Sequence, residues 1–373
     1  MAMQEGLRQL DGANQVKVHG RTSRTQFPIP LFWTASGVEA NVTGSELWVE
    51  LESDYAQYEP WISILLNSEP ISRLMIPKGR QWVCLFRGMN PETIKNVRIV
   101  KDVQAMSGDP DASLIVHGLK GNGELKPVED RPFKLEFIGD SITSGEGSIG
   151  AKPEEDWIPA WFSGVLNYTT LTAVALNADH RVLSQSGWGV MTSWDNNPNA
   201  NLPAGYEQVC GLLTGDKNAA LGAHEPNDFA AWQPDVVVIN LGTNDGGAFY
   251  NQEWKDPNTG KVHKQRLNED GSFHPEDLAS FEQAVQAFLI KLRKNNPKAD
   301  LVWAYGMLGL PMMPAIYRAV DTYIRQTGDR KVSVFQLPNT NEHTIGARMH
   351  PGRLAHEAAA KELSGYLKEL LKA

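Results

Sequence analysis

The sequence predicts an α/β protein of two domains, in which a β-sandwich of the jelly-roll kind precedes a parallel sheet covered by helices on both sides. Short strands separated by turn residues occupy the first part of the chain, and strands alternate with helical stretches in the second. The length of 373 residues exceeds the usual size of one domain, which favours two. We place the domains at residues 1–128 and 129–373.

The strands of the first domain are predicted from patterns of period two. Leu47, Val49 and Leu51 alternate with their neighbours, as in a strand with one buried face. Similar short runs follow, separated by turn residues such as those at 77–79; they lie at 61–65, 71–76, 82–86 and 94–101. Many short strands at this spacing indicate a sandwich or a jelly roll.

The second domain is predicted from a change of rhythm near Pro127. Strands are expected at 134–138, 181–184, 235–241, 300–305 and 331–335, and helices at 168–178, 278–292, 315–326 and after Pro351. The run DVVVINL at 235–241 is apolar throughout, which is typical of a strand buried on both faces. The long polar segment 246–273 is either a lid over a site or a solvated insertion.

Composition and charge exclude several classes of function. A net charge of −9 disfavours binding to nucleic acid or to an anionic membrane, because both need clustered Lys and Arg. No apolar run is long enough to span a bilayer. Cys84 and Cys210 are too few for a disulfide framework and show no zinc-like spacing, so each is predicted to be a small buried hydrophobe.

The amino-terminal sequence MAMQEGLRQLDG lacks the basic start and the apolar core of a secretory signal. We therefore expect a cytoplasmic protein. If Met1-Ala2-Met3 replaces a removed signal, the expected location is instead secreted or periplasmic.

Ser141 is the candidate nucleophile. It lies in EFIGDSITSGEG (136–147), directly after a predicted buried strand, and sites in open α/β sheets lie beyond the carboxyl ends of strands. A serine in a turn at this place can expose its hydroxyl and leave its N–H free, as acyl transfer requires. The alternative is a serine that only caps a helix.

Two further segments offer donors for a developing oxyanion. Gly187, in SQSGWGV (184–190), can bring its N–H close to a bound oxygen because no Cβ stands in the way. Asn244, in LGTNDGG (241–247), offers a side-chain amide at the end of the most apolar strand. The alternatives are an ordinary loop glycine and an asparagine that bonds to its own turn.

His350 is the candidate base. It precedes Pro351 in RMHPGRLAHEAAA (348–360), and proline at the first turn of a helix would place the imidazole at a loop-to-helix junction. His356 lies six residues on and is expected to be a surface or packing residue. His343 is a weaker competitor for the role of base.

The order of these four segments resembles the SGNH (GDSL) hydrolase superfamily. GDSIT, SQSG, GTND and HP follow one another from Gly139 to Pro351, across nearly the whole second domain. The resemblance implies a flavodoxin-like three-layer α/β/α hydrolase domain that needs no metal or organic cofactor. It also implies Ser141 as nucleophile, His350 as base, and an oxyanion hole formed by Ser141 N–H, Gly187 N–H and the Asn244 side chain.

Nearly the whole chain also resembles carbohydrate esterase family 2. The resemblance is carried by GRTSRTQFPIPLFWTASGVEANVTG (20–44), above all FWTASGVE (32–39), by the strands that follow and by EFIGDSIT. It implies a β-sandwich joined to an SGNH domain, and removal of acetyl groups from plant polysaccharides such as xylan and glucomannan. The expected partner is therefore an acetylated oligo- or polysaccharide, with no nucleic acid and no membrane.

One position departs from the SGNH pattern. Many members carry an aspartate three residues before the catalytic histidine, where this chain has Ala347. We therefore predict a Ser–His dyad in which a main-chain carbonyl accepts from His350 Nδ1. Asp245 and Glu342 are the nearest other carboxylates in the sequence, and on this hypothesis removing the charge of either should leave most of kcat intact.

Alternatives remain for the substrate. An esterase of the same fold could act on lipid, aryl or sialic-acid acetyl esters, and a decayed hydrolase could bind carbohydrate without turnover. A flat aromatic ring packs on a sugar face, and Trp188, beside Gly187, is the first candidate for such a platform. Trp157, Trp161 and Trp194 are weaker ones, and core packing is the alternative for all of them.

Overall fold

The computed structural model describes residues 6–10 and 15–372. Part of the amino-terminal segment MAMQEGLRQLDG, from whose sequence no secretory signal is predicted, lies outside these residues. The chain folds into two compact units. The first, the sandwich unit, runs to Arg131 and also includes Ile158–Ala160 and Gln208–Asn227; the second, the α/β unit, contains Pro132–Trp157, Trp161–Glu207 and Asp228 onward.

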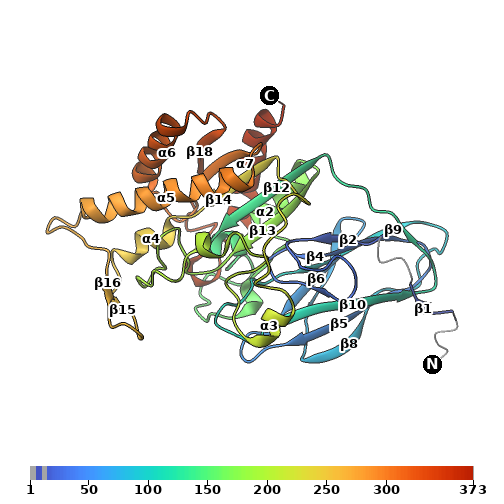
Figure 1. The fold of residues 1–373 in the computed structure, drawn as a ribbon. Helices are drawn as coiled ribbons and strands as arrows, with labels where there is room; N and C mark the ends of the chain where they lie inside the picture. Colours follow the sequence, from blue (N-terminus) through green and yellow to red (C-terminus); the bar gives the residue numbers. More distant parts are fainter. Residues whose placement is uncertain (1–5, 11–14, 373) are drawn as a thin grey trace. The chain divides into compact units, whose positions relative to one another are not determined.

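The sandwich unit contains two antiparallel sheets (Figure 1). One has the order β1-β10-β5-β8, with β3 paired to β10; its strands are β1 (Arg8–Gln9), β3 (Ile29–Pro30), β5 (Leu47–Asp54), β8 (Gly79–Phe86) and β10 (Ser113–Gly121). The other has the order β11-β4-β9-β6-β7, with β2 paired to β4; its strands are β2 (Lys17–His19), β4 (Gly37–Val42), β6 (Trp61–Leu66), β7 (Glu69–Met75), β9 (Lys95–Lys101) and β11 (Leu125–Lys126).

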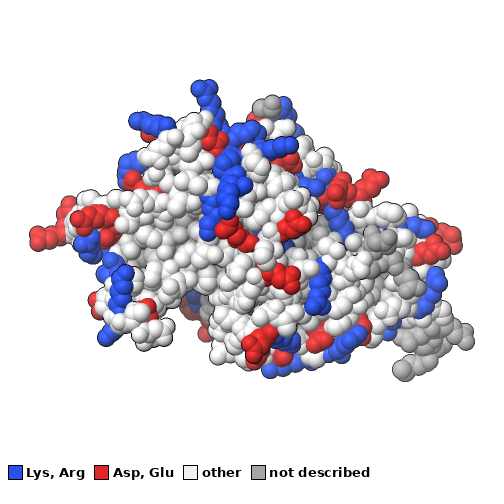
Figure 2. Space-filling model, in the orientation of Figure 1, with Lys and Arg blue, Asp and Glu red and all other residues white. Residues whose placement is uncertain are grey.

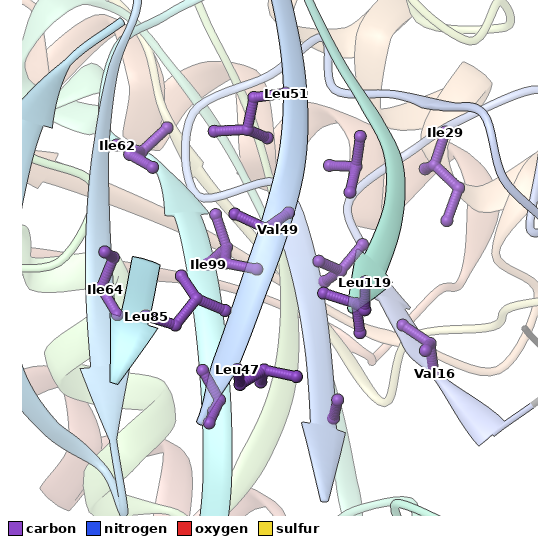
Figure 3. Close-up of a cluster of buried hydrophobic side chains, with 14 of the residues drawn as sticks. Val16, Ile29, Leu47, Val49, Leu51, Ile62, Ile64, Leu85, Ile99 and Leu119 are labelled. Carbon is purple, nitrogen blue, oxygen red and sulfur yellow. The ribbon is translucent and has the colours of Figure 1, made fainter. Parts of the chain in front are cut away.

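The core of the sandwich unit lies between these sheets. Figure 3 shows side chains from both of them, such as Val49 on β5 and Ile62 and Ile99 on β6 and β9, packed together. Along β5 every second residue is buried, as the alternation predicts. Burial of one such side chain contributes about 1.5–3 kcal/mol, so the shared core is the main stabilising term of this unit.

A segment from late in the sequence completes the sandwich unit. Residues 208–227, which contain α3 (Asp216–Ala220), bond to the amino-terminal strands and loops. Trp33 Nε1 donates to Val209 O at 2.7 Å, and Ser23 Oγ donates to Leu221 O at 2.7 Å. The chain therefore enters this unit more than once, whereas the sequence predicts a single boundary at 128/129.

The α/β unit is built on a parallel sheet of order β13-β12-β14-β17-β18. The strands are β12 (Phe133–Gly139), β13 (Ala178–Ser184), β14 (Val236–Asn240), β17 (Asp300–Gly306) and β18 (Val332–Leu337). All five residues of β14 are buried, as expected for a central parallel strand. Together with the sandwich sheets, this sheet confirms the predicted fold class.

Two pairs of helices cover the parallel sheet. α2 (Tyr168–Ala175) packs on α7 (Arg353–Leu370), and α5 (Pro275–Asn295) packs on α6 (Met313–Thr327). The chain runs from β12 to β13 in one direction and from β14 to β18 in the other, so right-handed crossovers place the two pairs on opposite faces. The strand order reverses between β12 and β14, and ligands of such sheets bind beyond the strand ends at this point.

The segment 246–273 is tied to the α/β unit at both ends. It contains the end of α4 (Thr243–Ala248) and a hairpin, β15 (Trp254–Lys255) and β16 (Val262–His263), that projects from the body of the unit (Figure 1). Asn196 Nδ2 donates to Ala248 O and Gln252 O, both at 2.9 Å, and Asn196 Oδ1 accepts from Gln265 N at 2.8 Å. These bonds hold the base of the hairpin, as either a lid or a solvated insertion would require.

Charged side chains of both signs lie on the surface (Figure 2). On the face drawn in Figure 2, acidic and basic side chains are interspersed. Among the described helices, none has the length and apolar character needed to cross a membrane. Within residues 6–10 and 15–372, His, Cys, Asp and Glu form no group of three or more that could hold a metal ion. Both cysteines are free; Cys210 is buried, as predicted, and Cys84 is half-buried.

Candidate active site

Ser141 lies just beyond β12, as the first residue of the short helix α1 (Ser141–Ser144). Asp140 caps this helix, because its Oδ1 accepts from Ile142 N at 3.0 Å. The strand must end in glycine here, since a Cβ on Gly139 would lie 2.1 Å from Thr143 Oγ1. The tight turn leaves Ser141 7% exposed at the carboxyl edge of the sheet, beside the point where the strand order reverses.

His350 meets Ser141 from the segment before α7. Its Nε2 lies 2.9 Å from Ser141 Oγ, and its Nδ1 lies 2.7 Å from the main-chain oxygen of Arg348. A carbonyl can only accept, so Nδ1 carries the proton and Nε2 is the acceptor for the serine hydroxyl. This is the tautomer that a general base needs. The main-chain acceptor expected from the sequence is therefore the carbonyl of Arg348.

The two other histidines near the carboxyl end lie elsewhere. His356 is buried on α7, where its ring stacks on Tyr168 and its Nδ1 accepts from Tyr168 N at 3.2 Å. Burial lowers the pKa of His356 to about 3, so it is a neutral packing residue. The side chain of His343 is 83% exposed and lies beside Glu342.

The expectation that Pro351 forms the first turn of the last helix is wrong. α7 begins at Arg353, with Gly352 as its N-cap. Pro351 instead forms an isolated bridge with Ile345, and His350 O accepts from Gly346 N at 2.7 Å. The imidazole is therefore held by a closed loop rather than by a helix.

The predicted oxyanion donors lie around this pair. Within the described residues, the backbone N–H groups of Ser141 and Gly187 donate to no protein acceptor, so both are available to a ligand. Gly187 has a φ of +80°, and a Cβ there would lie 2.9 Å from Trp194 Cδ1, so glycine is required. Asn244 Nδ2 donates to Asp140 Oδ2 at 3.2 Å and to Trp188 O at 3.0 Å.

These bonds link Asn244 to the residue before Ser141 and to the residue after Gly187. The structure therefore brings together all four segments that the sequence singled out. Both N–H bonds of the Asn244 amide are already used, so an oxyanion would have to displace one of these two acceptors or share an N–H with it. The 3.2 Å bond to Asp140 is the longer of the two. Burial raises the pKa of Asp140 to about 7, helped by the charges of Asp245 and Glu146.

Asp245 fixes the loop that follows the oxyanion glycine. Its fully buried carboxylate accepts from Val190 N, Met191 N and Thr192 N at 2.9, 2.8 and 3.1 Å. Burial raises the pKa of Asp245 to about 6, while these three N–H groups favour the ionised form. Asp245 thus holds the loop and, within the described residues, makes no bond to His350.

One residue of the site, Glu146, is not predicted by the sequence patterns. It is buried, its Oε1 lies 3.8 Å from His350 Nε2, and its Oε2 accepts from Ser186 Oγ at 2.6 Å. Arg348 Nε donates to Oε1 at 2.9 Å. An acid between two glycines directly after GDSITS was the available signal, but nothing local in the sequence shows which side chains it meets.

The chain matches a known protein family and several solved structures. The GDSL-like Lipase/Acylhydrolase family model matches residues 137–358, which include all four segments. Among solved structures, an acetyl xylan esterase (Est2A) from the rumen bacterium Butyrivibrio proteoclasticus has 46% identity and a TM-score of 0.96, over 98% of this chain and 98% of that one. A family two carbohydrate esterase from Clostridium thermocellum, in complex with cellohexaose, has 25% identity and a TM-score of 0.78, over 96% and 99% of the two chains.

Curated proteins are also similar to this chain over most of its length. The acetylxylan esterase / glucomannan deacetylase of Cellvibrio japonicus is 26% identical over 336 residues, which cover 88% of this chain and 81% of that protein. Another curated relative is much longer, and this chain spans 37% of its length. The resemblance to SGNH hydrolases is thereby confirmed, and the chain belongs to the GDSL-like lipase/acylhydrolase family.

Proposed function

We propose that the chain is a carbohydrate O-acetyl esterase that removes acetyl groups from xylan, glucomannan or their oligosaccharides. The observation that carries the reaction class is the 2.9 Å contact between Ser141 Oγ and a His350 ring whose tautomer is set by Arg348 O. The substrate class is supported by the similarity, over nearly the full length of the chain, to an acetyl xylan esterase. An acetylxylan esterase / glucomannan deacetylase gives further support.

The proposed reaction follows from the positions of these groups. His350 Nε2 takes the proton of Ser141 as Oγ attacks the acetyl carbonyl, and the oxyanion is stabilised by Ser141 N–H, Gly187 N–H and the Asn244 amide. Collapse forms an acetyl-enzyme, and the sugar oxygen leaves with the proton from His350. Water, activated by the same nitrogen, then releases acetate.

An exposed tryptophan beside the oxyanion glycine supports a sugar substrate. Trp194 is 51% exposed, and its ring borders Gly187. The main-chain N–H of Trp194 donates to Gly187 O at 3.0 Å. Trp188, the first candidate from the sequence, is half-buried, and its main-chain oxygen accepts from Asn244 Nδ2. Trp194, a weaker candidate from the sequence, therefore stands beside Trp188 as a candidate platform for a pyranose ring.

The substrate class is tested by comparing initial rates of release from acetylated xylan, acetylated glucomannan and p-nitrophenyl esters of acetate and long-chain acids. We expect acetate to be released from the polysaccharides and the acetyl ester to be preferred over long acyl chains. Preference for long chains, or no acetate from either polysaccharide, would overturn the proposal.

Asp245→Asn should impair the reaction although Asp245 makes no contact with His350. Asparagine replaces one accepting oxygen by an NH₂ group that faces main-chain N–H groups, so the loop from Gly187 to Thr192 must shift. A shift of about 1 Å in a group that contacts the transition state lowers kcat about 100-fold. Steady-state kinetics with p-nitrophenyl acetate measure the change.

Glu342→Gln is the matched control, because its side chain is 77% exposed and should leave kcat unchanged. Wild-type kcat in Asp245→Asn would show that the loop is held by its other contacts. The sequence predicts that removing the charge of either carboxylate leaves most of kcat intact. We keep this prediction for Glu342 and replace it for Asp245.

A further inference from the structure

Arg348 has an unfavourable backbone conformation, which contacts with other groups must stabilise. Arg348 and Met349 have φ values of +55° and +54°, in the left-handed region that favours glycine. Each such residue costs about 1–2 kcal/mol. This turn also presents Arg348 O to His350 Nδ1 at 2.7 Å. The acceptor that sets the tautomer of His350 therefore sits on a strained segment.

Three bonds from Arg348 hold that segment in place. Arg348 N donates to Glu154 O at 2.7 Å, and its Nη1 donates to Glu155 O at 2.8 Å. Its Nε donates to Glu146 Oε1 at 2.9 Å, and the Glu146 side chain is only 2% exposed. A charge-assisted bond to a buried carboxylate is the strongest of these contacts.

Glu146 also bonds to the turn that carries Ser141 and to the loop that carries Gly187. Its N–H donates to the main-chain oxygen of Ser141 at 3.0 Å, and its Oε2 accepts from Ser186, next to the oxyanion glycine. Gly147 follows with a φ of +75°, and a Cβ there would lie 2.6 Å from His350 Cβ. One buried residue thus touches the turn of the nucleophile, the oxyanion loop and the turn of the base.

Glu146 also lies close enough to act on the charge of the imidazole. Its Oε1 is 3.8 Å from His350 Nε2, and a negative charge at this distance from a partly desolvated ring favours the imidazolium that forms during the reaction. His356 on α7 interacts electrostatically with the ring, and the charged side chain of Arg348, on the same turn as His350, bonds to Glu146. Of these, Arg348 carries a positive charge and opposes the effect of Glu146.

We infer that Glu146 and Arg348 are paired positioning residues that replace the aspartate missing at position 347. Arg348 supplies the acceptor for Nδ1 from its main chain, and Glu146 anchors the arginine side chain and so keeps that acceptor in place. Glu146 also supplies the negative charge near the imidazole that an aspartate would have given. The inference rests on the proposed Ser–His reaction and adds two residues to it.

Two single variants separate the charge from the anchor. Glu146→Gln keeps the size of the side chain and removes its charge. Arg348→Gly removes the side chain, keeps the carbonyl and tolerates the positive φ. For each we expect kcat with p-nitrophenyl acetate to fall about 10- to 100-fold, because the base loses its alignment. KM should change less than about threefold, since no contact to the acetyl group is removed.

The pH dependence of kcat/KM gives a readout that a purely structural role would not move. Glu146→Gln removes a negative charge 3.8 Å from His350 Nε2, so the acidic limb of the profile should shift to lower pH. Arg348→Gly leaves Glu146 without its cation, so the limb should shift to higher pH. In the double variant the loss in kcat should not exceed the larger single loss, because both changes break the same link.

The controls decide what a failure means. Glu342→Gln should keep the wild-type profile, and thermal unfolding of each variant shows whether the fold is kept. Wild-type kcat in Glu146→Gln, additive losses, or limbs that shift in the same direction would overturn the inference while leaving the proposed function intact. A wild-type protein that does not turn over p-nitrophenyl acetate would instead remove the proposed function, and this inference with it.

Discussion

Ser141→Ala should lower kcat/KM for acetyl esters by about 10⁴- to 10⁶-fold, to the level left by binding and the oxyanion donors alone. Oγ is the atom that would form the acetyl-enzyme, and within the described residues its one hydrogen bond is to His350. Alanine removes only one oxygen from a residue that is 7% exposed, so the fold should be kept. Rates of acetate release from acetylated xylan and of p-nitrophenyl acetate hydrolysis measure the loss.

A covalent probe makes this result specific to the nucleophile. A fluorophosphonate should label the wild-type protein at Ser141, as intact-mass and peptide mass spectrometry would show, and should leave Ser141→Ala unlabelled. Ser144, buried three residues away on the same helix, offers a matched control, because Ser144→Ala should keep the labelling. Equal hydrolysis rates in wild type and Ser141→Ala would end the enzyme hypothesis.

His350→Ala should have an effect of the same order, because without Nε2 no group takes the proton of Ser141. The two residues act as a unit, so the double variant Ser141→Ala/His350→Ala should be no slower than the slower single variant. Progress curves at high enzyme concentration with p-nitrophenyl acetate are sensitive enough to compare these residual rates. The side chain is 18% exposed, which leaves room for a small molecule to enter the vacated space.

Added imidazole therefore gives a further test of the role of His350. Free imidazole should restore part of the activity of His350→Ala and none of that of Ser141→Ala. His343→Ala is the control, since that side chain is 83% exposed and should be replaceable without loss. If His350→Ala kept more than about a tenth of the wild-type rate, another base would have to be sought.

The strands that the sequence predicts well are those with an unbroken local pattern. β14 is predicted at 235–241 and spans Val236–Asn240, and the alternation at 47–51 lies within β5. β10 escapes prediction although it is nine residues long, because a bulge between Val116 and Gly118 interrupts its alternation. β4 is not among the predicted strands, although Val38, Ala40 and Val42 alternate with polar residues along it.

Contacts between distant segments are beyond any local pattern. The inclusion of 208–227 in the sandwich unit depends on bonds such as that between Trp33 Nε1 and Val209 O, across 176 positions of the sequence. The start of α7 at Arg353 rather than near Pro351 depends on the bridge between Pro351 and Ile345. In both cases a tertiary contact overrides the structure that the local sequence favours.

Local patterns in the sequence are enough to predict the two-domain fold class, the family and the four segments that carry Ser141, Gly187, Asn244 and His350. Glycine turns and apolar strands are encoded by neighbouring residues, so their order along the chain places these side chains at one edge of a sheet. Tertiary contacts, by contrast, are needed to find that Arg348 O orients His350, that Asp245 holds a loop and that Glu146 joins the site. These roles depend on distances between the ends of different strands, which packing sets and no local pattern records.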